Sequence, residues 1–315
     1  MKMEYITLNN TDLKVSRFCM GGCPIGNYGW GKKIREQDFI KVIHDAIDSG
    51  INYFDTADTY GLGQSERTLA KGIKGHRNDL VIQSKFGVRV ENGKTFYDNS
   101  PEYIRSALDA SLARLDTDYL DVYVMHYWDG KTPPDEIVFE LEALKKAGKI
   151  RCFGLSNIAL KDLPVWSKYK DSFANIQYEF SLACRNHEVE IFQANKLLNV
   201  TPMTWGSLGQ GVLTGKYDAS CVFGSEDRRS RDSYPNFHGN KLLKNLEIVE
   251  VLRKISGARE KTITACALRF ILDYIKDSVV IVGIKSSEQL FSNLESLNWT
   301  LTEEELSELN EISNS

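Results

Sequence analysis

The chain has 315 residues, of which 42% are hydrophobic and 26% charged, proportions that are ordinary for a globular protein. Its formal net charge of −4 argues against nucleic acid and anionic membrane as partners, since both need a basic surface. The most continuous apolar run, VVIVGI at residues 279–284, is far shorter than the roughly 20 residues that span a bilayer.

The N-terminal stretch and the cysteines together favour a cytoplasmic protein. MKMEYITLNN, at residues 1–10, has no apolar core of the kind that a secretory signal needs. The six cysteines are dispersed along the chain, which is typical of buried thiols in a reducing compartment rather than of a disulfide framework. Cys19 and Cys23 are the nearest pair, but no second pair or histidine cluster accompanies them, so we expect no metal site.

Eight short apolar runs are predicted to be strands, and most alternate with segments of helical period. The predicted strands cover residues 17–22, 51–55, 80–85, 121–126, 150–157, 174–177, 201–205 and 279–283. The predicted helices between them cover residues 36–49, 65–72, 101–115, 134–147 and 188–198. Strands that are apolar on both faces and alternate with helices are typical of a parallel sheet covered by helices. Eight such units favour an α/β protein with a closed (β/α)8 TIM barrel formed by residues 1–315 as a single domain.

Three regions depart from this repeat. Residues 4–16 are predicted to form a β-hairpin that caps the bottom of the barrel. Residues 215–240 form a polar loop, followed by helices predicted at 242–256 and 262–274. Loops of this length are usually functional or disordered, so Arg228, Arg229 and Arg231 either close over a bound phosphate or lie in solvent. The last segment, LTEEELSELNEI, is predicted to be a helix with Thr302 as its N-cap.

Polar side chains end strand after strand. In a parallel barrel the carboxyl ends of all strands open onto one face, where barrel enzymes keep their active sites. Residues far apart in the sequence are therefore expected to converge there. The strand-end residues are Asp55, Lys85, His126, Ser156 with Asn157, Gln177 and Trp205.

Convergence of these ends predicts a site for proton transfer. A buried carboxylate and a buried ammonium are each costly alone, so Asp55 and Lys85 must pair. Tyr60 follows the Asp55 strand closely and is expected to lie near the ammonium. A neighbouring cation would lower the pKa of the phenol and make Tyr60 a usable general acid/base. His126 would form a hydrogen bond with the substrate oxygen that exchanges a proton with Tyr60, and would orient that oxygen.

Seven motifs occur in order over nearly the whole chain: FDTADTYG, SKFG, the strand ending in His126, GLSN, NIQY, WGSLGQGVLTGK and VGIKSSEQLFSN. Together they resemble the aldo-keto reductase superfamily. The tryptophan at position 205 is similar to the residue found in the potassium-channel β-subunit branch of that superfamily. The resemblance implies a barrel oxidoreductase that transfers a hydride between a nicotinamide cofactor and an aldehyde, ketone or sugar carbonyl. It also implies a catalytic tetrad of Asp55, Tyr60, Lys85 and His126, in which Tyr60 protonates the carbonyl oxygen.

The resemblance also implies the cofactor residues. Ser156, Asn157 and Gln177 would hold the nicotinamide carboxamide, and Trp205 offers a flat face for the ring. A turn near the pyrophosphate would be formed by Gly206, Ser207, Leu208, Gly209 and Gln210, with Lys216 supplying charge. The adenosine-phosphate end would involve Gly283, Lys285, Gln289 and Asn293.

Lys285 near a helix start suits a 2′-phosphate, so NADP(H) is expected rather than NAD(H). Two positions depart from the family pattern. This chain reads IKSSEQ where many relatives carry Arg or Ser and Pro, and Ser207 replaces the usual proline.

The substrate side is predicted from the aromatic residues near the same strand ends. They are Tyr28, Trp30, Phe86, Tyr127 and Trp128. Tyr127, Trp128 and Asp129 combine aromatic faces with a carboxylate, which suits a sugar-like substrate.

Two other functions remain open on the sequence. A barrel aldolase would use Lys85 as a Schiff-base nucleophile, and a non-catalytic NADPH-binding sensor would keep the fold without turnover. GLGQSE, at residues 61–66, follows a turn rather than a strand and lacks a third glycine, so we interpret it as a turn before a helix rather than a dinucleotide fingerprint. Asp58 is likewise interpreted as a turn residue.

Overall fold

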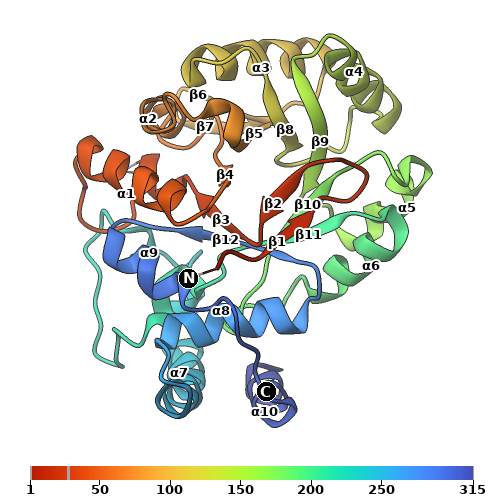
Figure 1. Ribbon diagram of the computed structural model, residues 1–315. Coiled ribbons are helices and arrows are strands. Elements are labelled where there is room, and N and C mark those ends of the chain that lie inside the picture. Colours follow the sequence, from red (N-terminus) through yellow and green to blue (C-terminus); the bar gives the residue numbers. More distant parts are fainter. Residues whose placement is uncertain (1, 27–28, 315) are drawn as a thin grey trace.

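Eight parallel strands close into a barrel in the computed structural model, which describes residues 2–26 and 29–314 (Figure 1). Around the barrel the order is β10-β11-β12-β3-β4-β5-β8-β9. The predicted (β/α)8 class is confirmed, and each predicted strand matches an observed one within a few residues. The strands are β3 (Phe18–Gly21), β4 (Tyr53–Asp55), β5 (Val81–Phe86), β8 (Leu120–Met125), β9 (Ile150–Ser156), β10 (Asn175–Glu179), β11 (Thr201–Trp205) and β12 (Val279–Gly283).

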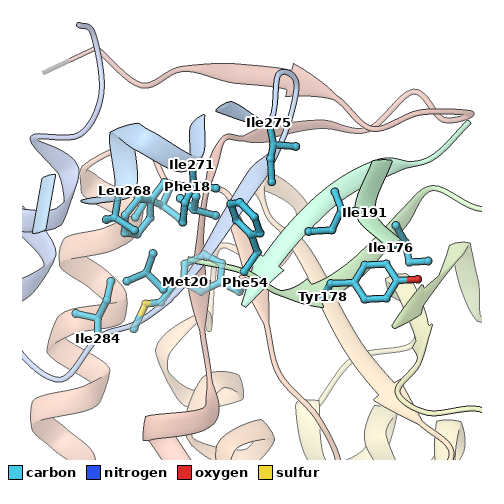
Figure 2. Close-up of a cluster of buried hydrophobic side chains, with 14 of the residues drawn as sticks. Phe18, Met20, Phe54, Ile176, Tyr178, Ile191, Leu268, Ile271, Ile275 and Ile284 are labelled. Atoms are coloured by element: carbon cyan, nitrogen blue, oxygen red, sulfur yellow. The ribbon is translucent and has the colours of Figure 1, made fainter. Parts of the chain in front are cut away.

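The strands are apolar on both faces because each face packs against a different apolar layer. In β8, Val122 and Val124 belong to the cluster inside the barrel, whereas Tyr123 and Met125 belong to the larger cluster between the barrel and its helices. Figure 2 shows part of this outer layer, in which Phe18 and Met20 of β3 lie with Leu268 and Ile271 of α8 (Ile263–Tyr274), and Ile176 of β10 lies with Ile191 of α6.

The helices that cover the barrel largely follow the predicted segments. They are α1 (Glu36–Asp48), α2 (Gln64–Gly72), α3 (Pro101–Leu115), α4 (Pro134–Lys146), α6 (Glu188–Leu198), α7 (Gly239–Arg259), α8 and α10 (Glu303–Asn314). The short α5 (Leu163–Trp166) was not predicted, and α9 (Ser287–Leu294) was expected only as a helix starting near Lys285. Thr302 caps α10 as expected: its Oγ1 accepts from the Glu305 N–H at 3.2 Å, and its own N–H donates to Glu305 Oε2 at 2.9 Å, which is a reciprocal capping box.

An N-terminal hairpin of β1 (Tyr5–Thr7) and β2 (Lys14–Ser16) lies across the barrel in Figure 1. Leu8, Leu13 and Val15 pack with the cluster that fills the barrel interior. These side chains therefore extend the inner core at the end of the barrel where the strands begin, and the opposite end is left for polar groups.

A second hairpin, β6 (Val88–Glu91) and β7 (Lys94–Tyr97), follows β5 directly. It was not predicted, because six of its eight side chains are exposed and its strands are only four residues long. The turn between its strands is Asn92-Gly93, with both residues at positive φ (50° and 75°). An Asn-Gly pair in this conformation is a strong hairpin signal, so the sequence did contain a usable indication.

The loop at 215–240 is ordered around its own small core rather than disordered. The rings of Tyr217, Phe223 and Phe237 contact one another at centroid distances of 4.9–5.5 Å. The Arg229 guanidinium lies 4.2 Å from the Phe223 ring centroid and forms an ion pair with Asp227 at 2.6 Å. Within residues 2–26 and 29–314, no helix is long and apolar enough to cross a membrane.

Candidate active site

The carboxyl ends of β4 and β5 bring Asp55 and Lys85 together inside the barrel mouth. Both side chains are buried, with relative exposures of 3% and 1%. Lys85 Nζ donates to both Asp55 oxygens at 2.7 Å and to the Thr56 carbonyl at 2.9 Å. The ammonium charge is thus paired and hydrogen-bonded, as a buried cation requires.

Two side-chain amides donate hydrogen bonds to the Asp55 carboxylate. Gln83 Nε2 donates to Asp55 Oδ1 at 2.6 Å, and Gln177 Nε2 donates to the same oxygen at 3.1 Å. Gln83 in turn accepts from Tyr53 and Asn175, so a buried polar layer lies under the site. Gln177 was predicted to hold a nicotinamide carboxamide. Its amide nitrogen donates to Asp55 at the barrel mouth.

Tyr60 reaches the same ammonium from the loop after β4, with its hydroxyl 3.4 Å from Lys85 Nζ. The expected lowering of its pKa is wrong. Burial and the nearby Asp55 carboxylate raise the pKa of the phenol well above its usual value. The reason is that Asp55 already neutralises Lys85, so no net cation remains to favour the phenolate. Tyr60 is therefore protonated at neutral pH and able to donate a proton.

His126 follows β8, and its ring meets the Tyr60 ring edge-on at a centroid distance of 6.0 Å. Burial, with a smaller effect from the Lys85 charge, lowers the pKa of the imidazole well below 6.5. The ring is therefore neutral at pH 7. All four predicted tetrad residues thus lie at one end of the barrel, where they include a protonated phenol and a neutral imidazole.

The predicted nicotinamide-side residues form a connected group. Asn157 Nδ2 donates to Ser156 Oγ at 2.8 Å and to the His126 carbonyl at 3.1 Å. The Trp205 indole N–H donates to Asn157 Oδ1 at 3.3 Å. Asn157 adopts a left-handed conformation, with φ of 56°, which asparagine tolerates better than most residues. The indole face at the end of β11 is therefore fixed relative to the tetrad.

The turn after β11 has an unusual backbone. Gly206, Gly209, Gln210 and Gly211 all have positive φ, and a Cβ on Gly209 would come within 2.8 Å of Ala183 Cβ. Ser207 turns its hydroxyl inward to the carbonyls of Thr204 and Ile281. This backbone is suited to presenting N–H groups to an anion.

Hydrogen bonds connect the Gln210 side chain of this turn to residues of neighbouring segments. Gln210 Nε2 donates to Glu179 Oε1 at 2.7 Å, and its Oε1 accepts from Asn236 at 2.6 Å. Leu208 is half-buried, whereas Lys216 is exposed beyond the turn. The structure therefore does not bring Lys216 into the hydrogen-bonded part of the predicted cofactor group.

Two cations lie close together at the predicted phosphate end. Burial, and then the charge of Arg229, lowers the pKa of Lys285. Asp227 is bonded to Arg229, and the Lys285 ammonium has no hydrogen-bond or ion-pair partner among the residues that the structure describes. A phosphate would supply the missing negative charge, so this pair fits an NADP(H) phosphate.

The start of α9 organises this corner. The Lys285 N–H donates to Gln289 Oε1 at 2.9 Å, and Asn293 is buried on the inner side of α9. A Cβ on Gly283 would lie 2.7 Å from Pro24, so β12 passes close to the loop after β3. These residues fit the predicted end of the cofactor site as supports rather than as free ligands.

The long loop is joined to the segment after β3. The Arg228 N–H donates to the Gly29 carbonyl at 2.9 Å, and its guanidinium lies over the Trp30 ring at 5.7 Å. Tyr234 also meets the Trp30 ring edge-on, at 5.5 Å. Arg228 and Tyr234 of the loop therefore pack against Trp30 in the segment after β3.

The predicted substrate residues divide into three groups. Trp30 and Tyr127 lie beside the site, whereas Tyr28 falls outside the described residues. Phe86 is wrong as a pocket residue: it is fully buried and packs against Tyr123 in the outer layer, because it follows Lys85 and side chains alternate along a strand. Trp128 packs against Trp166 and donates to the Thr132 carbonyl, so it stabilises the loop after β8.

Several residues at the mouth were missed. Cys23 accepts a hydrogen bond from the Trp30 indole at 3.3 Å and influences the pKa of Tyr60. Burial, and then the neighbouring Tyr97, Glu179 and Tyr234, raises the pKa of Tyr127. Glu179 lies two residues beyond the predicted strand that ended at Gln177, and it is the last residue of the observed β10.

Asp58 is more than the turn residue that we expected. Its Oδ1 is buried and has no hydrogen-bond partner among the described residues. Burial and the Glu66 carboxylate raise the pKa of Asp58 to about 7. The proton is therefore bound more tightly in the folded chain, and stability is expected to fall as pH rises from about 4 to about 7.

Asp58→Asn is expected to remove this pH dependence. The neutral amide imitates the protonated acid, so the variant should exceed the parent in stability at pH 8 by roughly 4 kcal/mol at most, and by little at pH 4.5. Urea unfolding of both proteins at the two pH values measures the difference. An equal gain at both values would show that Asp58 does not titrate in this range.

A closed barrel with an ion pair, a phenol and an imidazole at its carboxyl end has the architecture of a barrel enzyme. The sequence matches the model of the Aldo/keto reductase family over residues 17–314. It is 32% identical to aldo-keto reductase YhdN of Bacillus subtilis over 313 residues, covering 98% of this chain and 93% of that protein. It is also 32% identical to aldo-keto reductase yakc [NADP(+)] of Schizosaccharomyces pombe, covering 86% and 81%.

The fold is similar to that of the glycerol dehydrogenase AKR11B4 from Gluconobacter oxydans, with a TM-score of 0.88, 30% identity and coverage of 99% of this chain and 95% of that one. Aldo-keto reductase AKR11C1 from Bacillus halodurans, in its holo form, gives a TM-score of 0.80 at 26% identity, with coverage of 99% and 96%. The chain belongs to the aldo/keto reductase family. It is an oxidoreductase acting on small carbonyl compounds or the corresponding alcohols.

Proposed function

We propose that this chain is an NADP(H)-dependent carbonyl reductase in which Tyr60 is the general acid/base. The observation that carries the proposal is the Tyr60 hydroxyl 3.4 Å from a Lys85 ammonium that is bonded to both oxygens of Asp55. When bound, NADPH supplies the hydride. The protein must then place a proton donor at the oxygen of the carbonyl being reduced.

Each tetrad residue has a distinct part in that proton transfer. Tyr60 holds its proton at neutral pH because burial raises its pKa, so it donates to the carbonyl oxygen as charge develops there. The Lys85 ammonium stabilises the phenolate left behind, and Asp55 keeps Lys85 charged and in place. The neutral His126 ring donates a hydrogen bond to the same oxygen and orients it.

The preference for NADP(H) over NAD(H) rests on Lys285. Its ammonium lies beside Arg229 with too little negative charge around it, which favours a ligand with an additional phosphate. The name of the Schizosaccharomyces pombe relative, aldo-keto reductase yakc [NADP(+)], also includes this cofactor. Ser156, Asn157 and Trp205 would hold the nicotinamide end, and the positive-φ turn from Gly206 would receive the pyrophosphate.

Cofactor oxidation against a panel of carbonyl compounds tests the proposal. NADPH and NADH are compared optically with aromatic aldehydes, aldose sugars and three-carbon hydroxy-carbonyls, the last because a structural relative is described as a glycerol dehydrogenase. We expect turnover with NADPH at least tenfold faster than with NADH. The sugar-like substrate inferred from Tyr127, Trp128 and Asp129 keeps only Tyr127 at the site, because Asp129 accepts hydrogen bonds from Asn99, Lys131 and Thr132. Indifference to every sugar and hydroxy-carbonyl would refute it.

Lys285→Gln is expected to weaken NADPH binding about tenfold or more, because a charge-assisted bond to phosphate contributes roughly 1.5–3 kcal/mol. NADH binding should change less than twofold, since NADH lacks the 2′-phosphate. Fluorescence titration measures both affinities. Lys74→Gln, which removes the same charge from an exposed lysine after α2, is the control. Equal losses for both cofactors would place Lys285 elsewhere than at the 2′-phosphate.

The aldolase alternative is disfavoured by the hydrogen bonds of Lys85. A Schiff-base nucleophile needs a neutral amine with a free lone pair, but Lys85 Nζ directs its hydrogens to Asp55 and to the Thr56 carbonyl. Borohydride treatment with a carbonyl substrate is therefore expected to leave Lys85 unlabelled.

A further inference from the structure

Among the residues that the structure describes, none forms a hydrogen bond with Nδ1 of the His126 ring. Its backbone is held firmly, with the N–H donating to the Phe86 carbonyl at 2.8 Å and the carbonyl accepting from Asn157 at 3.1 Å. The ring nitrogen Nδ1, however, is buried without a hydrogen-bond partner among the described residues. A functional histidine is usually oriented by a bond from its second nitrogen, so another contact must set this ring.

Aromatic stacking is the contact that the structure provides. The His126 ring stacks on Tyr127, with centroids 5.2 Å apart and planes inclined by 25°. Tyr127 stacks in turn on Tyr97 of β7, at 5.2 Å and 28°. Tyr127 is thus held between two rings, and a continuous stack runs from the candidate active site to the exposed hairpin. Tyr97 itself is 50% exposed.

The hairpin is anchored so that Tyr97 stays in this place. At its base, buried Asn99 donates to the Tyr127 carbonyl at 3.2 Å and exchanges hydrogen bonds with Asp129 at 2.6 and 3.0 Å. Gly87, at φ of 96°, lets the chain leave β5, and a Cβ there would lie 2.5 Å from Asn99 Nδ2 and 2.9 Å from the Tyr127 carbonyl.

An ion pair adds a second anchor to the hairpin, joining Arg89 of β6 to Asp98 at 2.7 Å. This pair joins the two sides of the hairpin, and Asn99 just after β7 joins the hairpin to the loop after β8. These bonds hold the chain beside Tyr97 against the loop that carries Tyr127.

We propose that Tyr97 is a positioning residue for His126, acting through the ring of Tyr127. The inference rests on the proposed function of His126 as the group that orients the carbonyl oxygen. Tyr97 lies outside the predicted tetrad and cofactor residues, on an element that departs from the barrel repeat. Because a small misplacement of a catalytic group is costly, loss of the outer ring should reach the chemical step.

The test compares three variants of the full chain. Tyr97→Ala should lower the single-turnover rate of carbonyl reduction about three- to tenfold, with the NADPH dissociation constant unchanged within twofold. Tyr97→Phe should restore the parent rate within twofold, because the ring remains. Phe96→Ala is the matched control: Phe96 is the preceding residue of β7, on the opposite face, and is 48% exposed.

A second readout does not need turnover. The ring protons of His126, assigned with His126→Asn, should shift in the NMR spectrum of Tyr97→Ala and stay in place in Phe96→Ala. A Tyr97→Ala variant that matches the parent in rate and in the His126 signals would overturn the inference. So would a Tyr97→Phe variant as slow as Tyr97→Ala, since that result would point to a hydroxyl contact. If the parent protein reduces no carbonyl, the proposed function fails, and the NMR comparison alone decides whether Tyr97 positions His126.

Discussion

Replacing Tyr60 by phenylalanine is expected to lower kcat for carbonyl reduction by about 10²–10⁴-fold, the usual contribution of a positioned proton donor. The phenol hydroxyl lies 3.4 Å from the Lys85 ammonium at the barrel mouth. Phenylalanine keeps the ring that meets His126 edge-on and removes only the hydroxyl. Stopped-flow measurement of NADPH oxidation gives the chemical rate directly.

NADPH binding by Tyr60→Phe should match the parent within about twofold, because the lost group acts on the substrate oxygen. Comparing cofactor binding with turnover in the two proteins distinguishes an enzyme from a non-catalytic sensor. If the parent binds NADPH but turns over none of the carbonyl compounds, and Tyr60→Phe behaves identically, the sensor function is the better description. A fully active Tyr60→Phe would instead show that another group donates the proton.

Asp55→Asn is expected to destabilise the protein by about 3–5 kcal/mol, because it leaves the buried Lys85 ammonium without its counter-charge. The asparagine oxygen can still accept from Gln83, which holds Asp55 Oδ1 at 2.6 Å, so shape and one hydrogen bond are kept. Chemical denaturation at pH 7 measures the loss. Turnover should fall as well, since Lys85 would no longer be held as a cation beside Tyr60.

Adding Lys85→Met to Asp55→Asn provides the control. The double variant buries no charge at this position, so it should recover most of the lost stability while remaining inactive. The coupling free energy from this double-mutant cycle isolates the ion pair from the surrounding packing. A double variant that is less stable than either single one would mean that hydrogen bonds, rather than the charges, dominate at this position.

The fold was largely predictable because its signal is local. Runs such as those around Val122 and Val279 are apolar on both faces, and their alternation with helices leaves few arrangements other than a parallel barrel. The same rule places the carboxyl ends of all strands on one face, so Asp55, Lys85 and His126 could be grouped from the sequence before any contact was known.

The hairpin β6–β7 was missed for a physical reason. Six of its eight side chains are exposed, and the apolar/polar alternation in Val88–Glu91 is only four residues long, so Asn92-Gly93 was the clearest signal. As a result Tyr97 had no place in the predicted site. Its contact with Tyr127 depends on where two loops meet in space.

What the sequence determined by itself was the barrel, the family and the types of group at the strand ends, because these follow from periodicity and from motifs within single segments. The tertiary structure decided how those groups behave. It showed that Phe86 points away from the mouth, that Asp55 cancels the cation expected to acidify Tyr60, and that a ring stack holds His126. Burial and the sum of charges around an atom depend on segments distant in the chain, so no single stretch of sequence encodes them.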